Sequence, residues 1–185
     1  MTSTSKTGPD PAKSRGSRRG PIIRFVASFS ALLALFQVLI FYVITPSEAF
    51  QTYLHLSAHA SALLLELVGH SVTVDGSSIT AMDHSMSVEI RRGCDGLAPV
   101  SIMAAGVLAV SGALGRKVCG VLIGVGVLLA ANLVRIASMY LIGVHSPEHF
   151  DQSHQFVWPL ALIALAVLYW IFWADRVSTR TPTES

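Results

Sequence analysis

The sequence is poor in charged residues, since Asp, Glu, Lys and Arg make up only 13% of its 185 residues. A soluble domain carries about a quarter charged residues, so this shortage excludes an ordinary soluble protein. Apolar residues make up 52%, and we therefore predict an integral membrane protein with one compact domain. The basic residues lie beside apolar segments rather than in one patch, so no nucleic-acid partner is predicted.

Cysteine is also scarce, with Cys94 and Cys119 as the only two. They lie at opposite ends of predicted membrane segments, separated by roughly 30 Å of hydrocarbon. A disulfide needs its Cα atoms within about 7 Å, so the two thiols are expected to be free. A free Cys94 on the oxidising side of a membrane, where thiols are normally paired, suggests a chemical role.

Four apolar segments are predicted to cross the membrane. Three of them are long, and the fourth is shorter and rich in Ala and Gly but contains no charge. The long segments are residues 22–45, 119–144 and 156–173, and the short one is residues 97–114.

The residues around these spans are predicted to form two tails. Residues 1–21 are rich in Ser, Thr, Gly, Pro and basic residues, which is typical of disorder. The apolar run that follows is longer than the 7–15 residues of a cleavable signal peptide, so it is interpreted as a signal anchor. A membrane-embedded domain is expected over residues 22–174, with a second tail over residues 175–185.

The basic residues predict the orientation, because Lys and Arg collect on the cytoplasmic side. With four spans, ten of the 13 Lys and Arg residues fall on one side. Both termini are then cytoplasmic, and residues 46–96 and 144–155 face outward. The ten are Lys6, Lys13, Arg15, Arg18, Arg19, Arg24, Arg116, Lys117, Arg176 and Arg180.

The outward segment is predicted to begin with an amphipathic helix over residues 48–69. Apolar and small residues recur there at three- and four-residue steps, while His55, His59 and Glu66 fall on the other face. This pattern is typical of a helix in the membrane interface or over the mouth of a bundle. The alternative is a fifth span, which would place Cys94 in the cytoplasm and bury three polar side chains at high cost.

After this helix the apolar residues alternate, which predicts one or two short strands around an Asp75-Gly76 turn. They would form a small cap that leads into Cys94. The expected fold is therefore an all-α integral membrane protein: four transmembrane helices, an extracytoplasmic amphipathic helix and a small β-hairpin-like cap.

Cys94 is the first candidate for chemistry. Gly93 and Gly96 flank it, a helix is predicted to begin just after it, and Arg91 and Arg92 precede it. A helix N-terminus and neighbouring cations both favour the thiolate, which is the nucleophilic form. The simpler alternative is a small apolar residue packed at the start of a helix.

Two further candidates lie at the same predicted depth on other spans. Arg135 inside a span costs at least about 2.5–3.5 kcal/mol to insert, so it is expected to face a cavity or a partner. Asn132 lies one turn away and can orient it, although Arg135 could instead snorkel to the headgroups. His154 opens the last span and can exchange protons near neutral pH. In a helix bundle, groups at one depth on neighbouring helices converge readily.

Zinc is a further possibility, because all seven histidines lie in outward-facing segments. His55 with His59, and His145 with His149, have the i, i+4 spacing that a metal site can use. There is no His-Glu-x-x-His motif, and exposed polar faces explain the pairs. No metal and no cofactor are therefore predicted.

The motifs together resemble a known family. Cys-Asp-Gly-Leu from Cys94, Asn-Leu-Val-Arg-Ile from Asn132 and a histidine opening the last span are similar to the exosortase/archaeosortase family, most of all its short exosortase H branch. The similarity covers residues 85–173. It implies a cysteine protease or transpeptidase of the bacterial inner membrane that processes C-terminal sorting signals.

The resemblance also implies roles and partners. Cys94 aligns with the family nucleophile, Arg135 with its arginine and His154 with its histidine. Many members continue from that histidine into Gly-Trp, whereas Gln155 follows here, and His149 is the weaker candidate for the same role. The implied substrates are secreted proteins whose C-terminus carries a short motif, a transmembrane helix and a basic cluster, with membrane lipid as the surroundings. In the H branch the motif is similar to Ile-Pro-Thr-Leu with a nearby Trp-Gly.

Two other classes of function are compatible with the residues alone. One is another membrane thiol enzyme, such as an acyltransferase that uses lipid donors. The other is a non-enzymatic membrane assembly subunit. Such a subunit would depend on helix-packing glycines, for which the candidates are Gly106, Gly112, Gly124 and Gly126. For a protease, both hydrolysis and transfer to an acceptor amine fit the sequence.

Overall fold

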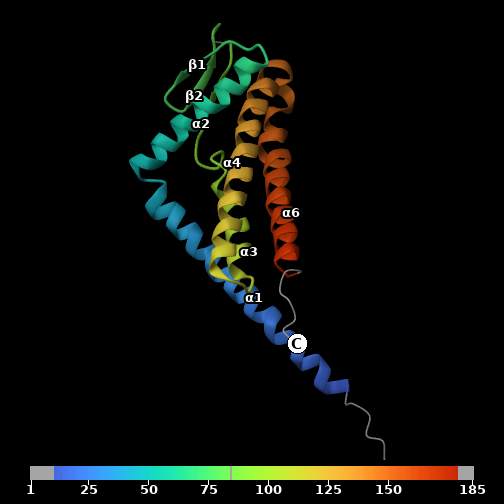
Figure 1. Cartoon of the computed structure of the whole chain (residues 1–185). Coiled ribbons are helices and arrows are strands. Elements are labelled where there is room, and N and C mark those ends of the chain that lie inside the picture. Colours follow the sequence, from blue (N-terminus) through green and yellow to red (C-terminus); the bar gives the residue numbers. More distant parts are fainter. Residues whose placement is uncertain (1–10, 84, 179–185) are drawn as a thin grey trace, which may run out of the picture.

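The computed structural model describes residues 11–83 and 85–178, and most of them are helical (Figure 1). The predicted tails fall partly on residues 1–10 and 179–185, which lie outside the described residues. The helices are α1 (Pro11–Leu39), α2 (Glu48–Leu67), α3 (Leu97–Ala109), α4 (Leu114–His145), α5 (Phe150–Gln152) and α6 (Trp158–Ser178). The strands are β1 (Val72–Asp75), β2 (Ser78–Ala81) and β3 (Ser87–Glu89), and the short turns are η1 (Ile40–Ile44), η2 (Pro147–His149) and η3 (Ser153–Val157).

Three helical stretches are long and apolar enough to cross a membrane, and they correspond to the three long spans predicted from the sequence. α1 begins at Pro11 rather than at residue 22; proline is tolerated in a first helical turn, and the Ala, Lys and Arg that follow are good helix formers. The stretches are Gly20–Ile44, Leu114–His145 and Pro147–Val177.

The fourth predicted span is shorter than expected. α3 has 13 residues, which is roughly 20 Å of helix, because the backbone becomes extended at Val110. Lys117 Nζ donates a hydrogen bond of 2.9 Å to the Leu108 carbonyl and so satisfies one of the carbonyl groups left free at the end of α3.

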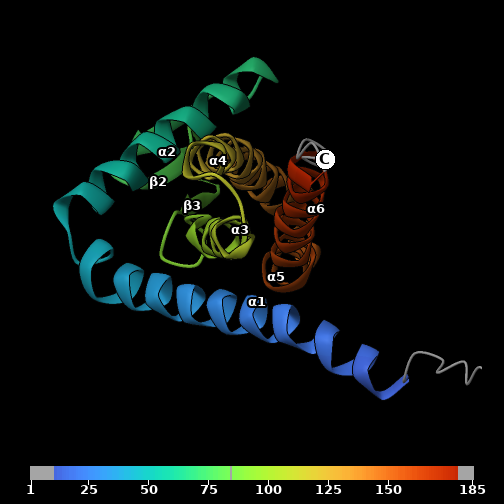
Figure 2. The same ribbon diagram turned by 60° about the horizontal axis from the view of Figure 1, so that its bottom comes forward.

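α3 lies inside the bundle, where it packs against α1, α4 and α6 (Figure 2). Its two ends are fixed to α4: the chain enters α3 beside Asn132 and leaves it beside Lys117. α3 and α4 are therefore antiparallel neighbours. Fifteen residues of α4 separate these two points, which corresponds to roughly 22 Å.

A first hydrophobic core, the bundle core, joins α3, α4 and α6. The helices approach closely because glycine has no side chain, which lets aromatic side chains pack directly on its backbone. A Cβ on Gly106 would lie 2.9 Å from Trp170, and one on Gly120 would lie 2.2 Å from a Trp173 ring atom. The centre of the bundle core consists of Met103, Val107, Leu128 and Ala166.

A second hydrophobic core, the cap core, joins α2 and the sheet to the last third of α4. The Ser47 hydroxyl caps α2 by accepting from the Phe50 N–H. One face of α2 is buried, while His55, His59 and Glu66 are exposed, as the sequence pattern predicts. The buried residues that define the cap core include Leu54, Ala58, Leu65, Ile79, Ile90, Ile136 and Tyr140.

The cap has more β-structure than predicted. β1, β2 and β3 form an antiparallel sheet in that order, and a turn at Gly76, with φ of +61°, joins β1 to β2. The predicted hairpin is present, but β3 extends it, so the expected all-α class needs this correction. Val88 packs on the cap core while Ser87 and Glu89 are exposed, and this period of two explains why the segment pairs as a strand.

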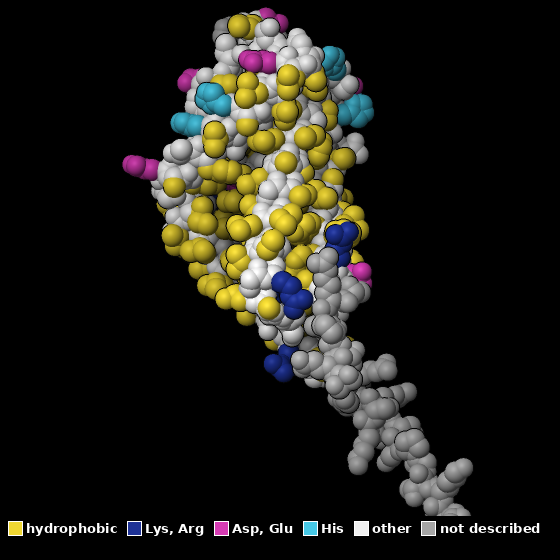
Figure 3. Space-filling model, in the orientation of Figure 1, with side chains coloured by type: hydrophobic (Ala, Val, Ile, Leu, Met, Phe, Trp, Pro, Cys, Tyr) yellow, Lys and Arg dark blue, Asp and Glu magenta, His cyan; other side chains and the backbone are white. Residues whose placement is uncertain are grey.

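On the face shown in Figure 3, the charged side chains are divided along the long axis of the molecule. Lys and Arg side chains gather there at the end where α4 begins and α6 ends, while His, Asp and Glu side chains lie mostly toward the cap (Figure 3). Hydrophobic side chains cover the length of the bundle between these two ends. This distribution is typical of a membrane protein, with an apolar band between two polar ends.

Candidate active site

Cys94 lies in a tight turn that joins β3 of the cap to α3 of the bundle. Gly93 and Gly96 have φ of +93° and +77°, a conformation that residues with a Cβ rarely adopt. At Gly96 a Cβ would also lie 2.9 Å from the Asn132 side chain. Position 96 therefore requires glycine for two reasons: its φ is positive, and α4 lies too close to leave room for a Cβ.

Asp95 holds this turn in shape from within. Its Oδ1 accepts from the Leu97 N–H at 2.8 Å and its Oδ2 accepts from the Gly93 N–H at 3.1 Å. The Tyr53 hydroxyl of α2 donates to the Asp95 carbonyl, which ties the turn to the cap. Sequence reasoning assigned no role to Asp95 or Tyr53, although an aspartate just before a predicted helix is a signal for N-terminal capping.

Asn132 and Arg135 of α4 bind the same turn from the other side. Asn132 Nδ2 donates to the Cys94 carbonyl at 3.0 Å. Arg135 Nη1 donates to the Gly93 carbonyl at 3.3 Å, and Nη2 lies 3.8 Å from Cys94 Sγ. Arg135 is only 4% exposed, so it points into the protein and does not snorkel.

His154 is the remaining candidate, and it comes from the start of the last predicted span. Its Nε2 lies 2.9 Å from Cys94 Sγ, within reach for proton exchange. The residue belongs to η3, a π-helical turn, and such turns are frequent at functional sites. Its ring stacks on Phe150, with ring centroids 6.1 Å apart. The structure thus brings Cys94, Arg135 and His154 together, with Asn132 behind them.

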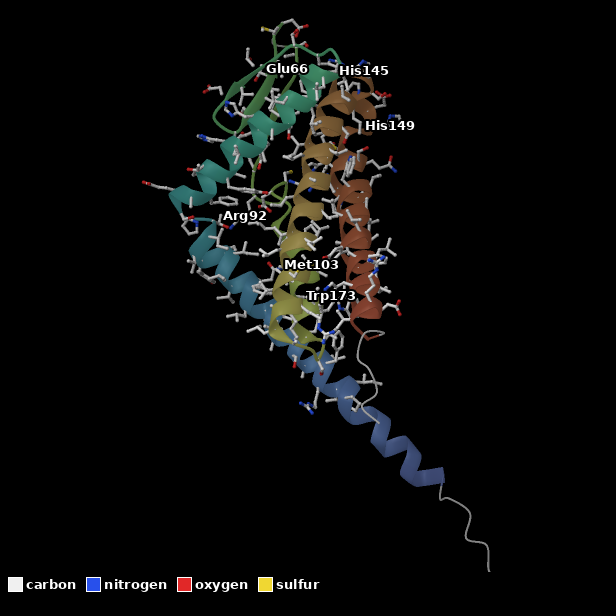
Figure 4. The ribbon with its side chains drawn as sticks, in the orientation of Figure 1. Glu66, Arg92, Met103, His145, His149 and Trp173 are labelled. Atoms are coloured by element: carbon white, nitrogen blue, oxygen red, sulfur yellow. The ribbon has the colours of Figure 1, made fainter. Side chains whose placement is uncertain are left out.

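The alternative histidine lies elsewhere. His149 is exposed, and its Nδ1 lies 3.2 Å from Glu148 Oε1. In Figure 4 it lies with His145 at the cap end of the helices. The thiol of Cys94 therefore faces His154.

One histidine of each pair considered for zinc lies within hydrogen-bond distance of a backbone carbonyl. His59 Nδ1 lies 2.9 Å from the His55 carbonyl, and His145 Nδ1 lies 3.0 Å from the Leu141 carbonyl. Within residues 11–83 and 85–178, no three His, Cys, Asp or Glu side chains gather as the ligands of a metal ion would.

The electrostatic environment of Cys94 differs from the one expected from the sequence. Burial raises the pKa of the Cys94 thiol, the charge of Arg135 lowers it, and the charge of Asp95 raises it, with the net shift upward. Arg91 is engaged in an ion pair with Glu89, and Arg92 stacks over the Phe41 ring at 4.7 Å. The net upward shift of this pKa disfavours the thiolate, and a neighbouring base would favour its formation.

The N-terminus of α3 does not lower the pKa of Cys94, because the Asp95 carboxylate already accepts a hydrogen bond from the Leu97 N–H there. A capping carboxylate takes up the helix N–H groups that would otherwise favour a thiolate. His154 is the group placed to receive the thiol proton. The arrangement thus corresponds to a thiol with an adjacent general base rather than to a preformed thiolate.

A cavity of about 180 Å³ opens over the thiol. Cys94, Arg135 and His154 line it together with apolar side chains of α4 and α5. It is large enough to admit part of an extended peptide. The remaining lining consists of residues 87–90 of β3 and its end, with Ile136, Met139 and Phe150.

Comparison with known proteins identifies the family of the chain. The sequence model described as transmembrane exosortase (Exosortase_EpsH) matches residues 22–171, which include every side chain of the site and most of the described structure. No curated protein and no solved structure matches the chain significantly. The match confirms the resemblance inferred from the Cys94, Asn132–Ile136 and His154 motifs. The chain belongs to the transmembrane exosortase family.

Proposed function

We propose that this protein is a membrane cysteine protease or transpeptidase that cleaves the C-terminal sorting signals of secreted proteins. The observation that carries the proposal is the contact of 2.9 Å between Cys94 Sγ and His154 Nε2, with Arg135 beside the sulfur. A nucleophile, a base and a cationic hydrogen-bond donor around one cavity are the groups that acyl transfer requires.

The reaction follows from this geometry in two steps. His154 Nε2 accepts the proton of the Cys94 thiol as the sulfur attacks the scissile carbonyl carbon, and Arg135 donates hydrogen bonds to the oxygen that becomes negative. The C–N bond then breaks, His154 returns the proton to the leaving amine, and an acyl-enzyme thioester remains. Water or an acceptor amine next attacks the thioester, giving its proton to His154, and the thiol leaves protonated.

The proposed topology has four crossings of the bacterial inner membrane, with both termini in the cytoplasm. Arg116 and Lys117 mark the cytoplasmic boundary, and Asn132 lies roughly 22 Å further along α4. The hydrocarbon is roughly 30 Å thick, so Cys94, which Asn132 binds, lies near the outer boundary. α2 and the sheet then sit over this boundary, facing outward.

The position of Cys94 near the outer boundary of the membrane fits the proposed substrate. A secreted protein held by a C-terminal transmembrane helix presents the residues just before its helix at the outer boundary of the membrane. A short motif at that position would enter the cavity over Cys94, while the basic cluster that follows the helix remains in the cytoplasm.

Labelling of single thiols tests on which side of the membrane Cys94 and Cys119 lie. In intact cells, a membrane-impermeant maleimide should label Cys94 in the Cys119→Ser variant. In the Cys94→Ala variant, Cys119, which is exposed beside the basic end, should react only after permeabilisation. The reverse pattern would contradict the orientation.

Cleavage of a tail reporter tests the activity. The reporter is a secreted domain followed by an Ile-Pro-Thr-Leu motif with a nearby Trp-Gly, an apolar helix and a basic cluster, expressed together with the enzyme. Cys94→Ala and Cys94→Ser should accumulate the uncleaved reporter, and Cys119→Ser should process it like the wild type. Normal processing by Cys94→Ala would refute the nucleophile assignment, since the other thiol lies at the far end of α4.

A further inference from the structure

β3 is the edge strand of the cap sheet, and among the described residues no strand pairs with its other side. The sheet order is β1-β2-β3, with Val88 opposite Ile79. The Ile90 N–H donates to the Ser77 carbonyl, and the Ala81 N–H donates to the Met86 carbonyl. Residues 86, 88 and 90 therefore direct their backbone groups toward β2.

In an antiparallel pair, alternate residues direct their N–H and C=O groups to opposite sides of the strand. Ser87 and Glu89 consequently direct theirs away from β2. Within the described parts of the chain, no hydrogen bond engages these four groups. β3 thus offers two N–H donors and two C=O acceptors, spaced as a further strand requires.

This free edge borders the cavity that contains the reactive groups. The same cavity is lined by residues 87–90, by Cys94, Arg135 and His154, and by Phe150. Most edge strands are protected because their free groups pair with other chains. An unpaired edge at the wall of a candidate active site is instead suited to bind an extended peptide.

We propose that the substrate residues preceding the scissile bond bind as a fourth strand on the free edge of β3. The proposal rests on the proposed function, because it describes how the same site holds its peptide. The backbone groups of Ser87 and Glu89 supply the hydrogen bonds. Cys94, five residues after Glu89, then meets the carbonyl at the end of the added strand.

The direction of the added strand follows from the direction of β3. Met86 packs on Gly143, near the cap end of α4, whereas Cys94 binds Asn132, eleven residues deeper. β3 therefore runs from the cap end toward the bundle. A substrate whose folded domain lies outside and whose C-terminal helix lies in the membrane runs the same way, so the two strands are parallel.

The cavity also determines which protein side chains the side chains of the added substrate strand contact. Side chains of a strand alternate between its two faces. One set faces the apolar wall formed by Ile136 and Met139 of α4, and the other faces outward. Apolar residues at every second position of the motif should therefore contribute to recognition.

Proline substitutions in β3 test the pairing while preserving the sheet. Glu89→Pro and Ser87→Pro each remove one N–H of the free edge and no backbone bond to β2, and such positions tolerate proline. Ser87→Pro also removes the hydroxyl that lies 2.9 Å from Thr80 Oγ1 of β2, so Glu89→Pro is the cleaner test. We expect kcat/KM for the tail reporter to fall at least about fivefold, the value of one hydrogen bond, mainly through KM. Thr73→Ala on β1, at the opposite edge of the sheet and outside the cavity lining, should remain within about twofold. Val88→Pro, which removes a bond to β2, should destabilise the protein.

A second measurement uses the unaltered enzyme. Synthetic peptides with the Ile-Pro-Thr-Leu motif and its flanking residues are N-methylated at one backbone position at a time, proline excepted because it has no N–H, and offered to the purified wild-type protein. Cleavage should fall at every second position before the scissile bond, because only those N–H groups face β3. A uniform profile, together with an unchanged Glu89→Pro variant, would overturn the strand pairing and leave the protease activity intact. If the unmodified peptide is not cleaved, both proposals fail.

Discussion

The cap core and the bundle core are built by different means. The cap core packs one face of α2 and a small sheet against the end of α4, whereas the bundle core packs three helices through glycine–aromatic contacts. Among the described residues, the two buried charged side chains are Asp95 and Arg135. Both lie where the two cores meet, beside Cys94.

The difference between the two cores indicates what each of them contributes to the candidate site. The bundle core sets the spacing of α3, α4 and α6, and therefore the distance between Cys94, Arg135 and His154. The cap core contributes β3, and Tyr53 of α2 holds the Asp95 carbonyl. Burying Arg135 is costly, and its hydrogen bonds to the turn offset this cost. Substitutions at the junction should thus change the chemistry, and substitutions in the bundle core should change stability.

The largest effect is expected from His154→Ala at the junction. Loss of a general acid–base costs about 10²–10⁴-fold in rate, and His154 contacts the thiol directly. Cleavage of the tail reporter by purified enzyme should fall by this factor, with the protein still folded. His149→Ala is the matched control, because its side chain is exposed and contacts Glu148. A greater loss from His149→Ala would reverse the assignment of the two histidines.

Arg135→Lys is expected to have the next largest effect. Lysine keeps the charge but cannot bond the Gly93 carbonyl and approach the sulfur at the same time, as the two guanidinium nitrogens do. The loss of one donor to the developing oxyanion costs about 10²–10³-fold in kcat. Arg116→Lys, at the far end of α4, should retain full activity. Single-turnover cleavage of the reporter measures both, and an active Arg135→Lys enzyme would contradict the proposed role.

The sequence predicted the bundle better than the cap, and the reason is physical. Hydrocarbon imposes length and composition on a span, so the three long helices could be located from apolar runs alone. α3 was predicted too long, because composition does not reveal that Val110 becomes extended. The third strand was missed since a strand of three residues depends on its partner β2, and pairing between strands is not encoded locally.

The sequence indicated which residues make up the candidate site, but not the direction in which the pKa of Cys94 is shifted. The free thiol, the arginine in a span and the histidine at a span boundary are each unusual in sequence, and the structure places them together. The sequence predicted a lowered pKa for the Cys94 thiol, whereas burial raises it. Arg91 and Arg92 are adjacent in sequence but engaged with Glu89 and Phe41, and burial depends on neighbours that the sequence does not name.

In the bundle core, Gly120→Ala should reduce stability without changing the chemistry. Its Cβ would lie 2.2 Å from Trp173, and overpacking of this kind costs about 1–3 kcal/mol. Gly126→Ala is the control, since nothing lies within 4 Å of a Cβ there and alanine favours the helix. Thermal unfolding in detergent should separate the two, while kcat per folded molecule stays unchanged. A loss of kcat in Gly120→Ala would mean that the bundle core and the site are coupled.

The smallest expected effect is a change in how Cys94 reacts with pH, measured by iodoacetamide alkylation in a His154→Ala, Cys119→Ser background. Only the thiolate reacts, and burial raises the pKa of Cys94. The rate should therefore rise at higher pH in the folded protein than in the same protein unfolded in detergent.

The charge of Arg135 is the largest influence that lowers this pKa, so Arg135→Ala should move the inflection of the alkylation profile further upward. Arg135→Lys should keep it nearly in place, because a cation remains. That variant thus separates the two contributions of the residue: it preserves the charge that acts on the thiol but removes the two-nitrogen geometry that acts on the carbonyl. An inflection below that of the unfolded protein would show a preformed thiolate, and His154 would then protonate the leaving group without first acting as a base.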